Sequence, residues 1–231
     1  MQITQTVVDK INELLDHGLV HGLGKPKVGQ MCVEAAICFA LGLPHGDDPK
    51  CVLPALRSLK ISLNDRAWSS NKARAEGLRR LAIAQLGSDT LDTKDFLTRL
   101  ARMTIQTMVP SALRSAARVL TGEHPTRLLA LALKCEQEPT EANAREANKA
   151  AADAYAADAY AYAAAAADAY AADAYAYAAA AAYAAAAAAD AYAYADAADA
   201  RDGVLAAYAE NVVQILIEMK APGCEWLKVA A

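Results

Sequence analysis

The chain has 231 residues and a formal net charge of −4. This length suffices for one substantial hydrophobic core or two small ones. Residues 1–150 carry a net charge of +4 and residues 151–231 one of −8, so the two parts can attract each other or offer different faces to a partner. This imbalance is too weak to indicate nucleic acid as a partner.

The cysteines and the beginning of the chain bear on the compartment. Five cysteines, an odd number without framework spacing, predict free thiols in a reducing compartment. The residues after Met1 do not have the pattern of a secretory signal peptide, and the alanine-rich stretch near the C-terminus contains too many aspartates for a membrane span. We therefore expect a cytoplasmic protein without a membrane partner.

The first quarter of the chain predicts three helices separated by glycine and proline. Apolar residues at helical spacing predict a helix over residues 4–16, with a C-terminal cap at His17 and Gly18. A second helix, over residues 29–41, is apolar on nearly all sides, and we expect it to be buried. Pro49 is expected at the first position of a short helix that ends near residue 59.

The middle of the chain continues the helical pattern. Ser69 or Ser70 is a suitable N-cap for a helix over residues 72–86, and Gly87 is expected to end it. Asp92 is expected to cap the next helix, which runs to residue 109. Two further helices are predicted from their opening prolines, one from Pro110 to about residue 120 and one from Pro125 to about residue 137.

The C-terminal part begins with the alanine-rich segment, which we expect to start at Pro139 and to end at Gly203. A last amphipathic helix is predicted to run to Pro222, with Trp226 packing behind it. No strand-like alternation of useful length occurs, so the predicted fold class is all-α, a multi-helix bundle. The predicted divisions are an N-terminal helical domain (1–139), an Ala/Tyr/Asp-rich helical repeat segment (140–202) and a C-terminal amphipathic helix with a tail packing on the bundle (203–231).

The alanine-rich segment has the most unusual sequence in the chain. Residues 151–200 contain 34 Ala, nine Tyr and seven Asp and nothing else. Alanine has the highest helix propensity, and no Gly, Pro or β-branched residue competes with a helix here. The sequence of residues 153–167 is repeated letter for letter in residues 168–182. We therefore predict a long helical repeat.

This repeat allows two arrangements. The tyrosines fall on all sides of the helix axis at about 100° per residue. Either the segment forms two or three antiparallel helices, with tyrosine rings between alanine-coated backbones, or it is one rod of about 80 Å covered by partners. We favour antiparallel helices, because so apolar a rod should not stay exposed to water. Duplication of a short unit that the fold merely tolerates also explains the repetition.

The repeat tyrosines are candidate partner-binding residues, because tyrosine is an efficient interface residue. Packing between the alanine-coated helices is the simpler explanation for them. The candidates are Tyr155, Tyr160, Tyr162, Tyr170, Tyr175, Tyr177, Tyr192 and Tyr194.

Several short motifs along the chain resemble uncharacterised proteins of bacteriophages and bacteria. The similar proteins also carry an Ala-Tyr tail and close on a segment like residues 219–225. The resemblance covers most of the chain and implies a mobile-element or accessory setting, but it implies no activity. Ala-rich helical immunity proteins of bacterial toxin systems are similar only in composition. The motifs are Met31-Cys32-Val33-Glu34-Ala35-Ala36, Gly42-Leu43-Pro44-His45, Leu63-Asn64-Asp65, Trp68-Ser69-Ser70 and Leu86-Gly87-Ser88-Asp89.

Candidate chemistry is sparse. Cys32 lies near a predicted helix N-terminus, where the helix dipole can depress the pKa of a thiol, but a straight helix would separate it from the candidate base His45 by about 20 Å. Burial as small apolar residues explains Cys32 and Cys38 more simply. Cys32, His45, Asp48 and Cys51 could share a zinc ion, yet their spacing matches no usual pattern. We expect no metal and no cofactor.

Two polar clusters have a structural explanation beside a functional one. Residues 64–66 could bind a ligand, but a turn and a helix cap are needed at that point. Arg74, Arg79 and Arg80 could line a phosphate-binding face, but a solvated helix side is expected, because aromatic residues do not interleave with them.

These observations favour a non-enzymatic helical interaction protein that binds a protein partner, as an inhibitor or an immunity-like factor. Two other classes stay open. One is a structural or self-assembling helical oligomer that associates through the same alanine-rich helices. The other is a thiol-dependent enzyme that uses Cys32 as its nucleophile.

Overall fold

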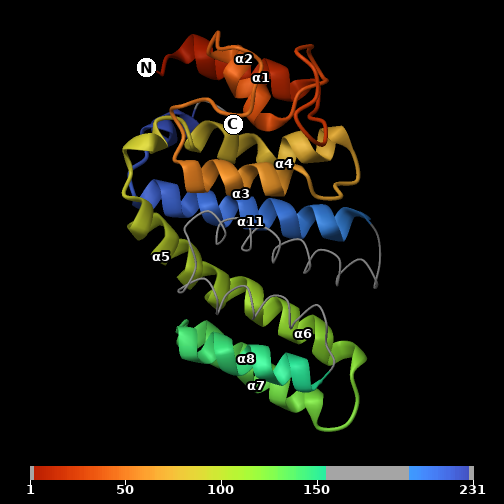
Figure 1. Ribbon diagram of the computed structural model, residues 1–231. Helices are drawn as coiled ribbons and strands as arrows, with labels where there is room; N and C mark the ends of the chain where they lie inside the picture. Colours follow the sequence, from red (N-terminus) through yellow and green to blue (C-terminus); the bar gives the residue numbers. More distant parts are fainter. Residues whose placement is uncertain (1–2, 155–197, 229–231) are drawn as a thin grey trace. The chain divides into compact units, whose positions relative to one another are not determined.

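The computed structural model describes residues 3–154 and 198–228 of the chain (Figure 1). These residues form helices and contain no β-strand, and a single isolated bridge joins Gly24 to Met31. The predicted all-α multi-helix fold is therefore confirmed. The eight candidate tyrosines and the predicted antiparallel helices lie within residues 155–197, outside the described residues.

The chain divides into two compact units. Unit 1 comprises residues 1–96 and 205–231, and unit 2 comprises residues 97–204. The limits of the units fall inside two helices, α5 (Thr93–Met103) and α11 (Ala198–Glu218). The three-segment division of the chain that composition suggests stays a prediction.

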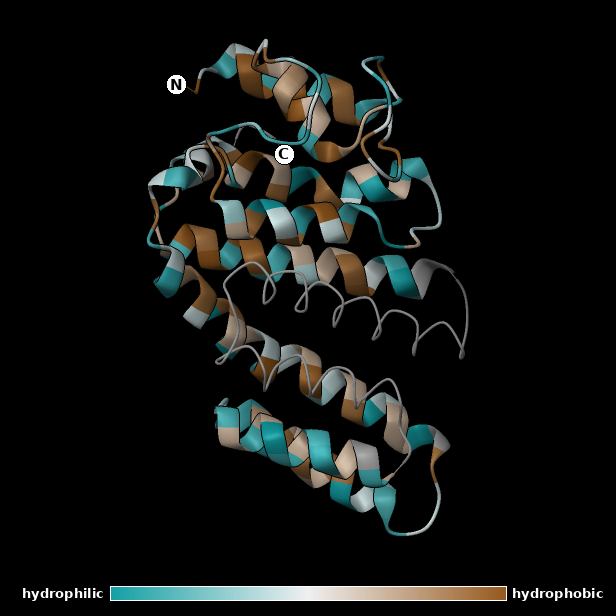
Figure 2. Ribbon diagram, viewed as in Figure 1, coloured by the Kyte–Doolittle hydropathy of each residue, from teal (hydrophilic) through white to brown (hydrophobic). Residues whose placement is uncertain are grey.

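Unit 1 packs four helices, a final helical turn and the C-terminal part of α11 around one apolar core. Helix α1 contacts α2 and α4, α2 contacts α3 and α4, and the final turn η3 contacts α4. Apolar residues recur along each of these helices (Figure 2). The bounds are α1 (Gln5–Asp16), α2 (Val33–Ala40), α3 (Pro54–Asn64), α4 (Asn71–Ala84) and η3 (Pro222–Lys228).

The predicted helix caps in this part of the chain are confirmed. The Ser70 hydroxyl accepts a hydrogen bond from the backbone N–H of Ala73 at 3.0 Å, so Ser70 caps α4. An Asp92 carboxylate oxygen accepts from the backbone N–H of Asp95 at 2.7 Å at the start of α5. His17 is the C-cap of α1. Short polar side chains satisfy the free N–H groups of a helix start, and this local chemistry is visible in the sequence.

The second helix begins four residues later than predicted. Gly29 has φ +72°, in the left-handed region that a right-handed helix cannot use. Gly24, also left-handed, approaches the backbone so closely that a Cβ atom there would lie 2.1 Å from the Gln30 carbonyl oxygen. The chain therefore forms a tight loop up to Met31, and α2 starts at Val33.

The third helix starts at Pro54, so the prediction of a start at Pro49 is wrong. Lys50 has φ +58°, a left-handed conformation that interrupts any helix from Pro49 onward. Both prolines can open a helix because neither has an N–H to satisfy. The conformation of Lys50 decides between them, and Ile61 consequently lies inside α3 instead of after it.

Unit 2 is a set of consecutive packed helices. Helix α5 continues through a π-helical turn, Thr104–Met108, into α6, so the predicted helix over residues 93–109 changes its hydrogen-bonding pattern near its end. Helix α6 packs on α7, and α7 packs on α8. The predicted helix start near Pro125 agrees with the structure, whereas no separate helix opens at Pro110, because the chain is already helical through Met108. The bounds are α6 (Val109–Val119), α7 (His124–Gln137) and α8 (Glu141–Asp153).

Gly203 does not end a helix, contrary to the prediction. Helix α11 begins at Ala198 and runs through Gly203 to Glu218. A glycine inside a helix costs only about 1 kcal/mol relative to alanine, and strong apolar packing further along the helix outweighs that cost. Among the helices of the described residues, none combines the length and the apolar character needed to cross a membrane.

Candidate functional site

Cys32 is a buried helix cap. Its side chain is only 5% exposed, and its Sγ accepts a hydrogen bond from the backbone N–H of Ala35 at 3.4 Å. Burial raises the pKa of the Cys32 thiol, and the hydrogen bond at the helix start offsets this only in part. Cys32 and Cys38 are both buried, as the simpler interpretation of the sequence predicts, and the alternative of a depressed Cys32 thiol pKa is not supported, because desolvation outweighs the effect of the helix.

The residues that could have shared a zinc ion with Cys32 make other contacts. The His45 Nε2 atom lies 3.3 Å from the Gly24 carbonyl oxygen, and Asp48 forms an ion pair with Arg57 at 3.1 Å. Cys51 lies in the wall of a surface cleft. Within residues 3–154 and 198–228, no group of three or more His, Cys, Asp or Glu side chains is placed to hold a metal ion.

Residues 64 and 65 hold the loop between α1 and α2 in place. The Asn64 side chain accepts from the backbone N–H of Val33 at 3.3 Å and donates to the Val20 carbonyl oxygen at 3.0 Å. The Asp65 carboxylate accepts from the backbone N–H of Gly22 at 2.8 Å, and Asp65 is the C-cap of α3. The structure thus gives these polar residues the structural role of a turn and cap.

Arg74 is buried, so the prediction that it lies on a solvated helix side is wrong. Its side chain is 5% exposed. The guanidinium donates to the carbonyl oxygens of Asn64 at 2.7 Å and Leu19 at 2.8 Å, and to the Asn71 side chain at 2.9 Å. A planar guanidinium has five N–H donors, so one side chain can bond several carbonyl oxygens that the backbone of α4 could not reach. Arg74 therefore joins the ends of α1 and α3 to α4.

Arg79 and Arg80 do lie at the surface, and each forms an ion pair. Arg79 contacts Asp16 of α1 at 2.7 Å, and Arg80 contacts Glu210 of α11 at 2.9 Å. Both guanidinium groups thus join helices of unit 1. The arginines of α4 do not form one continuous phosphate-binding face.

The core of unit 1 contains a buried ion pair. Glu34 of α2 and Lys60 of α3 are both fully buried, with 3.3 Å between the Lys60 Nζ and Glu34 Oε1 atoms. Gln85 donates to the other Glu34 oxygen at 3.3 Å. Burial raises the pKa of Glu34 and lowers the pKa of Lys60. Each charge loses its hydration inside the core, so the stability of the arrangement depends on the partner being present.

A small, partly open pocket of about 100 Å³ adjoins Glu34. Cys32, Asn64, Asp65 and Asp47 also line it. Its size and polar lining suit a few water molecules and not a substrate of ordinary size. The buried pair and this pocket therefore serve the core of unit 1 better than they would serve a reaction site.

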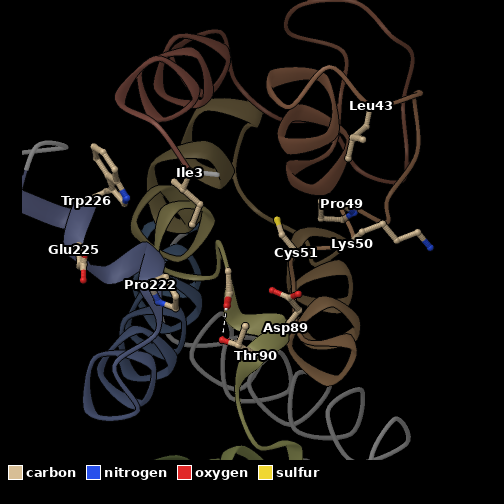
Figure 3. Close-up of a pocket in the computed structure, with 11 residues that line it drawn as sticks. Ile3, Leu43, Pro49, Lys50, Cys51, Asp89, Thr90, Pro222, Glu225 and Trp226 are labelled. Atoms are coloured by element: carbon tan, nitrogen blue, oxygen red, sulfur yellow. Dashed lines mark hydrogen bonds between the residues drawn. The ribbon is translucent and has the colours of Figure 1, made fainter. Parts of the chain in front are cut away.

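A surface cleft of about 560 Å³ is the better candidate for binding (Figure 3). Four segments form it: the N-terminus, the loop between α2 and α3, the short turn η1 (Ser88–Thr90) with Gly87, and η3. Figure 3 shows the residues of η3 and Ile3 on one side of the cleft and the loop residues before α3 on the other. The lining residues are Ile3, Leu43, Pro49, Lys50, Cys51, Gly87, Asp89, Thr90, Pro222, Glu225 and Trp226.

The floor of the cleft is tightly built. Gly87 has φ +74°, and a Cβ atom there would lie 3.0 Å from Pro222 and 3.2 Å from Ile3. The backbone N–H of Asp89 donates to the Cys51 carbonyl oxygen at 3.4 Å. Only glycine meets both the conformation and the space at position 87. The close packing at Gly87 therefore brings η1 against Ile3 and η3 at the floor of the cleft.

The chemistry of the cleft favours binding over covalent catalysis. Cys51 is the nucleophilic side chain in its wall, and it is only 7% exposed. Burial raises the pKa of the Cys51 thiol, and the nearby Asp89 carboxylate raises it further. A protonated, enclosed thiol is a poor nucleophile. The remaining lining consists of apolar residues, charged residues and Thr90, whose hydroxyl donates to the Gly87 carbonyl oxygen at 3.0 Å.

Sequence reasoning missed this cleft. It expects Trp226 to pack behind the last helix, whereas Trp226 is half-buried and lines the cleft. The burial of Lys60 was also not predicted from the sequence. Its spacing is that of an ordinary surface lysine, and its partner Glu34 lies on another helix. Clusters of glycine and proline near residues 44–49, 87 and 222 are the visible signal that turns meet there.

Comparisons of the chain with models of protein families, with curated proteins and with solved structures gave no match.

Proposed function

We propose that this chain is a non-enzymatic helical interaction protein of the cytoplasm that binds a protein partner. In the mobile-element or phage setting that the resemblance implies, it acts as an accessory protein, as an inhibitor or an immunity-like factor. The five free thiols support a reducing compartment. The raised thiol pKa values of Cys32 and Cys51 count against a thiol-dependent enzyme.

The observation that carries this proposal is the composition of the unit 1 cleft. Its walls combine Ile3, Leu43 and Pro222 with the large aromatic side chain of Trp226, and charged residues lie around them. Protein interfaces combine apolar and polar contacts in this way. Tryptophan is the residue type most enriched among side chains that dominate binding energy. A protruding side chain of a partner fits a cleft of this volume.

The tyrosines of the repeat remain the second proposed contact surface. Their support is sequence composition: rigid alanine-rich helix, tyrosine hydroxyls and aspartate carboxylates offer polar and aromatic contacts together. The cleft and the repeat tyrosines are two separate proposed contact surfaces, so substitutions can remove one without the other.

The proposal is tested by capture from an extract of the source cells with matched baits. The first variant, Leu43→Arg, places a long charged side chain in the cleft wall. Its control is Leu133→Arg, the same change at an exposed leucine of α7 outside the cleft. The third bait changes the eight candidate tyrosines to alanine. Captured proteins are quantified by mass spectrometry, purified and titrated against each bait by calorimetry.

We expect one protein to bind the wild type and the Leu133→Arg chain with equal affinity, and the Leu43→Arg chain at least tenfold more weakly. A tyrosine variant that also loses affinity assigns the repeat to the same interface. The proposal fails if no purified protein binds the wild-type chain, or if affinity is the same for all four chains. Sedimentation of the wild-type chain alone separates the oligomer alternative, which requires self-association.

A further inference from the structure

The charges around the cleft are not balanced. Lys50 is the one cation among the described lining residues, and its Nζ contacts the Asp48 carboxylate at 2.5 Å. In Figure 3 the Lys50 side chain extends away from the other lining residues. The charge of Lys50 is therefore paired with Asp48, which does not line the cleft.

The two carboxylates of the lining have no such partner. Asp89 and Glu225 are both exposed, and neither has an ion-pair partner among the described residues. They approach the cleft from different segments, Asp89 from η1 and Glu225 from η3. The cleft thus presents two uncompensated negative charges beside an apolar wall.

The rest of the lining suits a long side chain with a cationic end. Ile3, Leu43 and Pro222 can contact an alkyl stem, and Trp226 adds an aromatic side chain to the same lining. Arginine stacks on aromatic rings and forms paired hydrogen bonds with carboxylates, which a lysine ammonium does less well. A purely apolar ligand would leave both carboxylates without a partner, and an acidic one would be repelled.

We propose that the cleft binds a basic side chain, best an arginine flanked by apolar residues, on a segment of the protein partner. This inference rests on the proposed function and names the chemistry of the partner. Asp89, in the middle of the cleft in Figure 3, binds the guanidinium, Glu225 at the edge adds to the negative charge, and the aliphatic wall with Trp226 contacts the stem and the neighbouring apolar residues.

The test uses a short capped peptide with arginine between two leucines, and the same peptide with citrulline, a neutral isostere, in place of arginine. Binding to the full chain is followed by NMR through the indole N–H signals. The chain has two tryptophans. Trp226 lines the cleft, whereas Trp68 is buried and donates its indole N–H to the Leu63 carbonyl oxygen at 3.0 Å, so Trp68 is an internal reference.

We expect the arginine peptide to shift the Trp226 signal and leave that of Trp68 unchanged, with an affinity about tenfold above that of the citrulline peptide. Asp89→Asn should weaken binding about threefold to fivefold, the upper range for an exposed ion pair, and Glu225→Gln should weaken it less. Glu76→Gln, a neutralised exposed carboxylate on α4 outside the cleft, should change nothing. Added salt should weaken the arginine peptide selectively.

Three outcomes overturn the inference. Equal affinity of the two peptides, both abolished by Leu43→Arg, shows a cleft without preference for a basic residue, and the proposed function then still stands. No shift of Trp226 at millimolar arginine peptide shows that the cleft does not take this side chain, and only the capture experiment then bears on the proposed function. Capped arginine alone binding as tightly as the peptide shows a small-molecule site instead of a protein contact.

Discussion

Unit 1 contains a fully buried ion pair besides its surface pairs, whereas the named ion pairs of unit 2 are all exposed. In unit 1, Glu34 and Lys60 face each other with both side chains fully buried. In unit 2, Arg114 pairs with Glu136 and Lys134 with Glu146, and every one of these side chains keeps a third or more of its surface exposed.

This difference teaches how each unit specifies its packing. A buried charge tolerates only the arrangement that provides its partner, so Glu34 and Lys60 fix how α2 lies on α3. An exposed pair contributes little energy and leaves the packing to apolar faces. In unit 2 those faces consist largely of leucine and alanine, such as Leu128 and Leu131 of α7 and Ala147 of α8.

The strongest test of this comparison removes one lysine from each unit. Lys60→Met leaves the Glu34 carboxylate buried without its partner, and breaking a buried pair in this way costs about 3–5 kcal/mol of stability. Lys134→Met, the same change at the surface of unit 2, should leave the unfolding curve unchanged. Urea unfolding measures both, and the fluorescence of Trp68 and Trp226 reports on unit 1.

A double variant sharpens the same test. Glu34→Leu combined with Lys60→Met replaces both charges by apolar side chains of similar size, so most of the lost stability should return. A double variant as unstable as Lys60→Met would instead show that the two charges do not act on each other.

The second prediction asks whether the two units also differ in their thiols. We expect no difference, because burial raises the pKa of Cys38 in unit 1 and of Cys135 in unit 2 alike, each to about 11. At pH 8 both should react with a thiol reagent about a hundredfold or more slower than in the unfolded chain, since the thiolate is the reactive form. Cys224 has a pKa of about 11 but is less enclosed, and it should react first.

Labelling is followed by mass spectrometry of the digested chain with and without urea. Rapid labelling of Cys32 in the native chain would contradict the burial described above and revive the thiol-dependent enzyme. A rate at Cys32 that matches the rates at Cys38 and Cys135 agrees with its structural role.

The third prediction compares two arginines of α4, one buried and one at the surface. Arg74→Lys keeps the charge but loses the planar set of donors that bonds Asn64, Leu19 and Asn71, and acceptors left unsatisfied should cost about 2 kcal/mol. Arg79→Lys retains a cation next to Asp16 and should change stability by less than about 0.5 kcal/mol. Equal costs in thermal or urea unfolding would argue that the burial of Arg74 has no energetic role.

The smallest effect is expected at the exposed pair of unit 2, and it depends on pH. Hydrogen bonds from Arg114 lower the pKa of Glu136 below its usual value. A lowered pKa in the folded state contributes stability above the unfolded pKa of about 4.5, and this is lost as pH falls through the folded value. Arg114→Ala should therefore cost less than about 1 kcal/mol at pH 7, and the cost should shrink as the pH falls below about 4.5.

This pH series is measured by circular dichroism, because unit 2 contains no tryptophan. A destabilisation by Arg114→Ala that persists at pH 3 would trace to lost packing of the arginine stem instead of the ion pair.

Features that depend on a few neighbouring residues were predictable. Ser70 and Asp92 are caps wherever a helix begins after them, and Pro125 opens a helix because it lacks an N–H. The choice between Pro49 and Pro54 was not predictable, since the left-handed backbone of Lys50 depends on the surrounding loop. Gly203 misled for a related reason, because packing keeps it inside α11.

The candidate site was far less accessible to sequence reasoning. Its two free carboxylates, Asp89 and Glu225, are 136 positions apart and look like ordinary surface residues. Arg74 resembled its neighbours Arg79 and Arg80 in sequence, and only its position over the ends of α1 and α3 made it a core residue.

The sequence by itself determined the all-α class, most helix starts and the alanine-rich repeat, because helix propensity and capping act over three or four residues. The tertiary structure alone decided that Glu34 meets Lys60, that Arg74 is buried and that Ile3, Asp89 and Trp226 line one cleft. These contacts depend on how the helices pack. The energy of a buried charge depends on its partner, and that partner lies far away in the sequence.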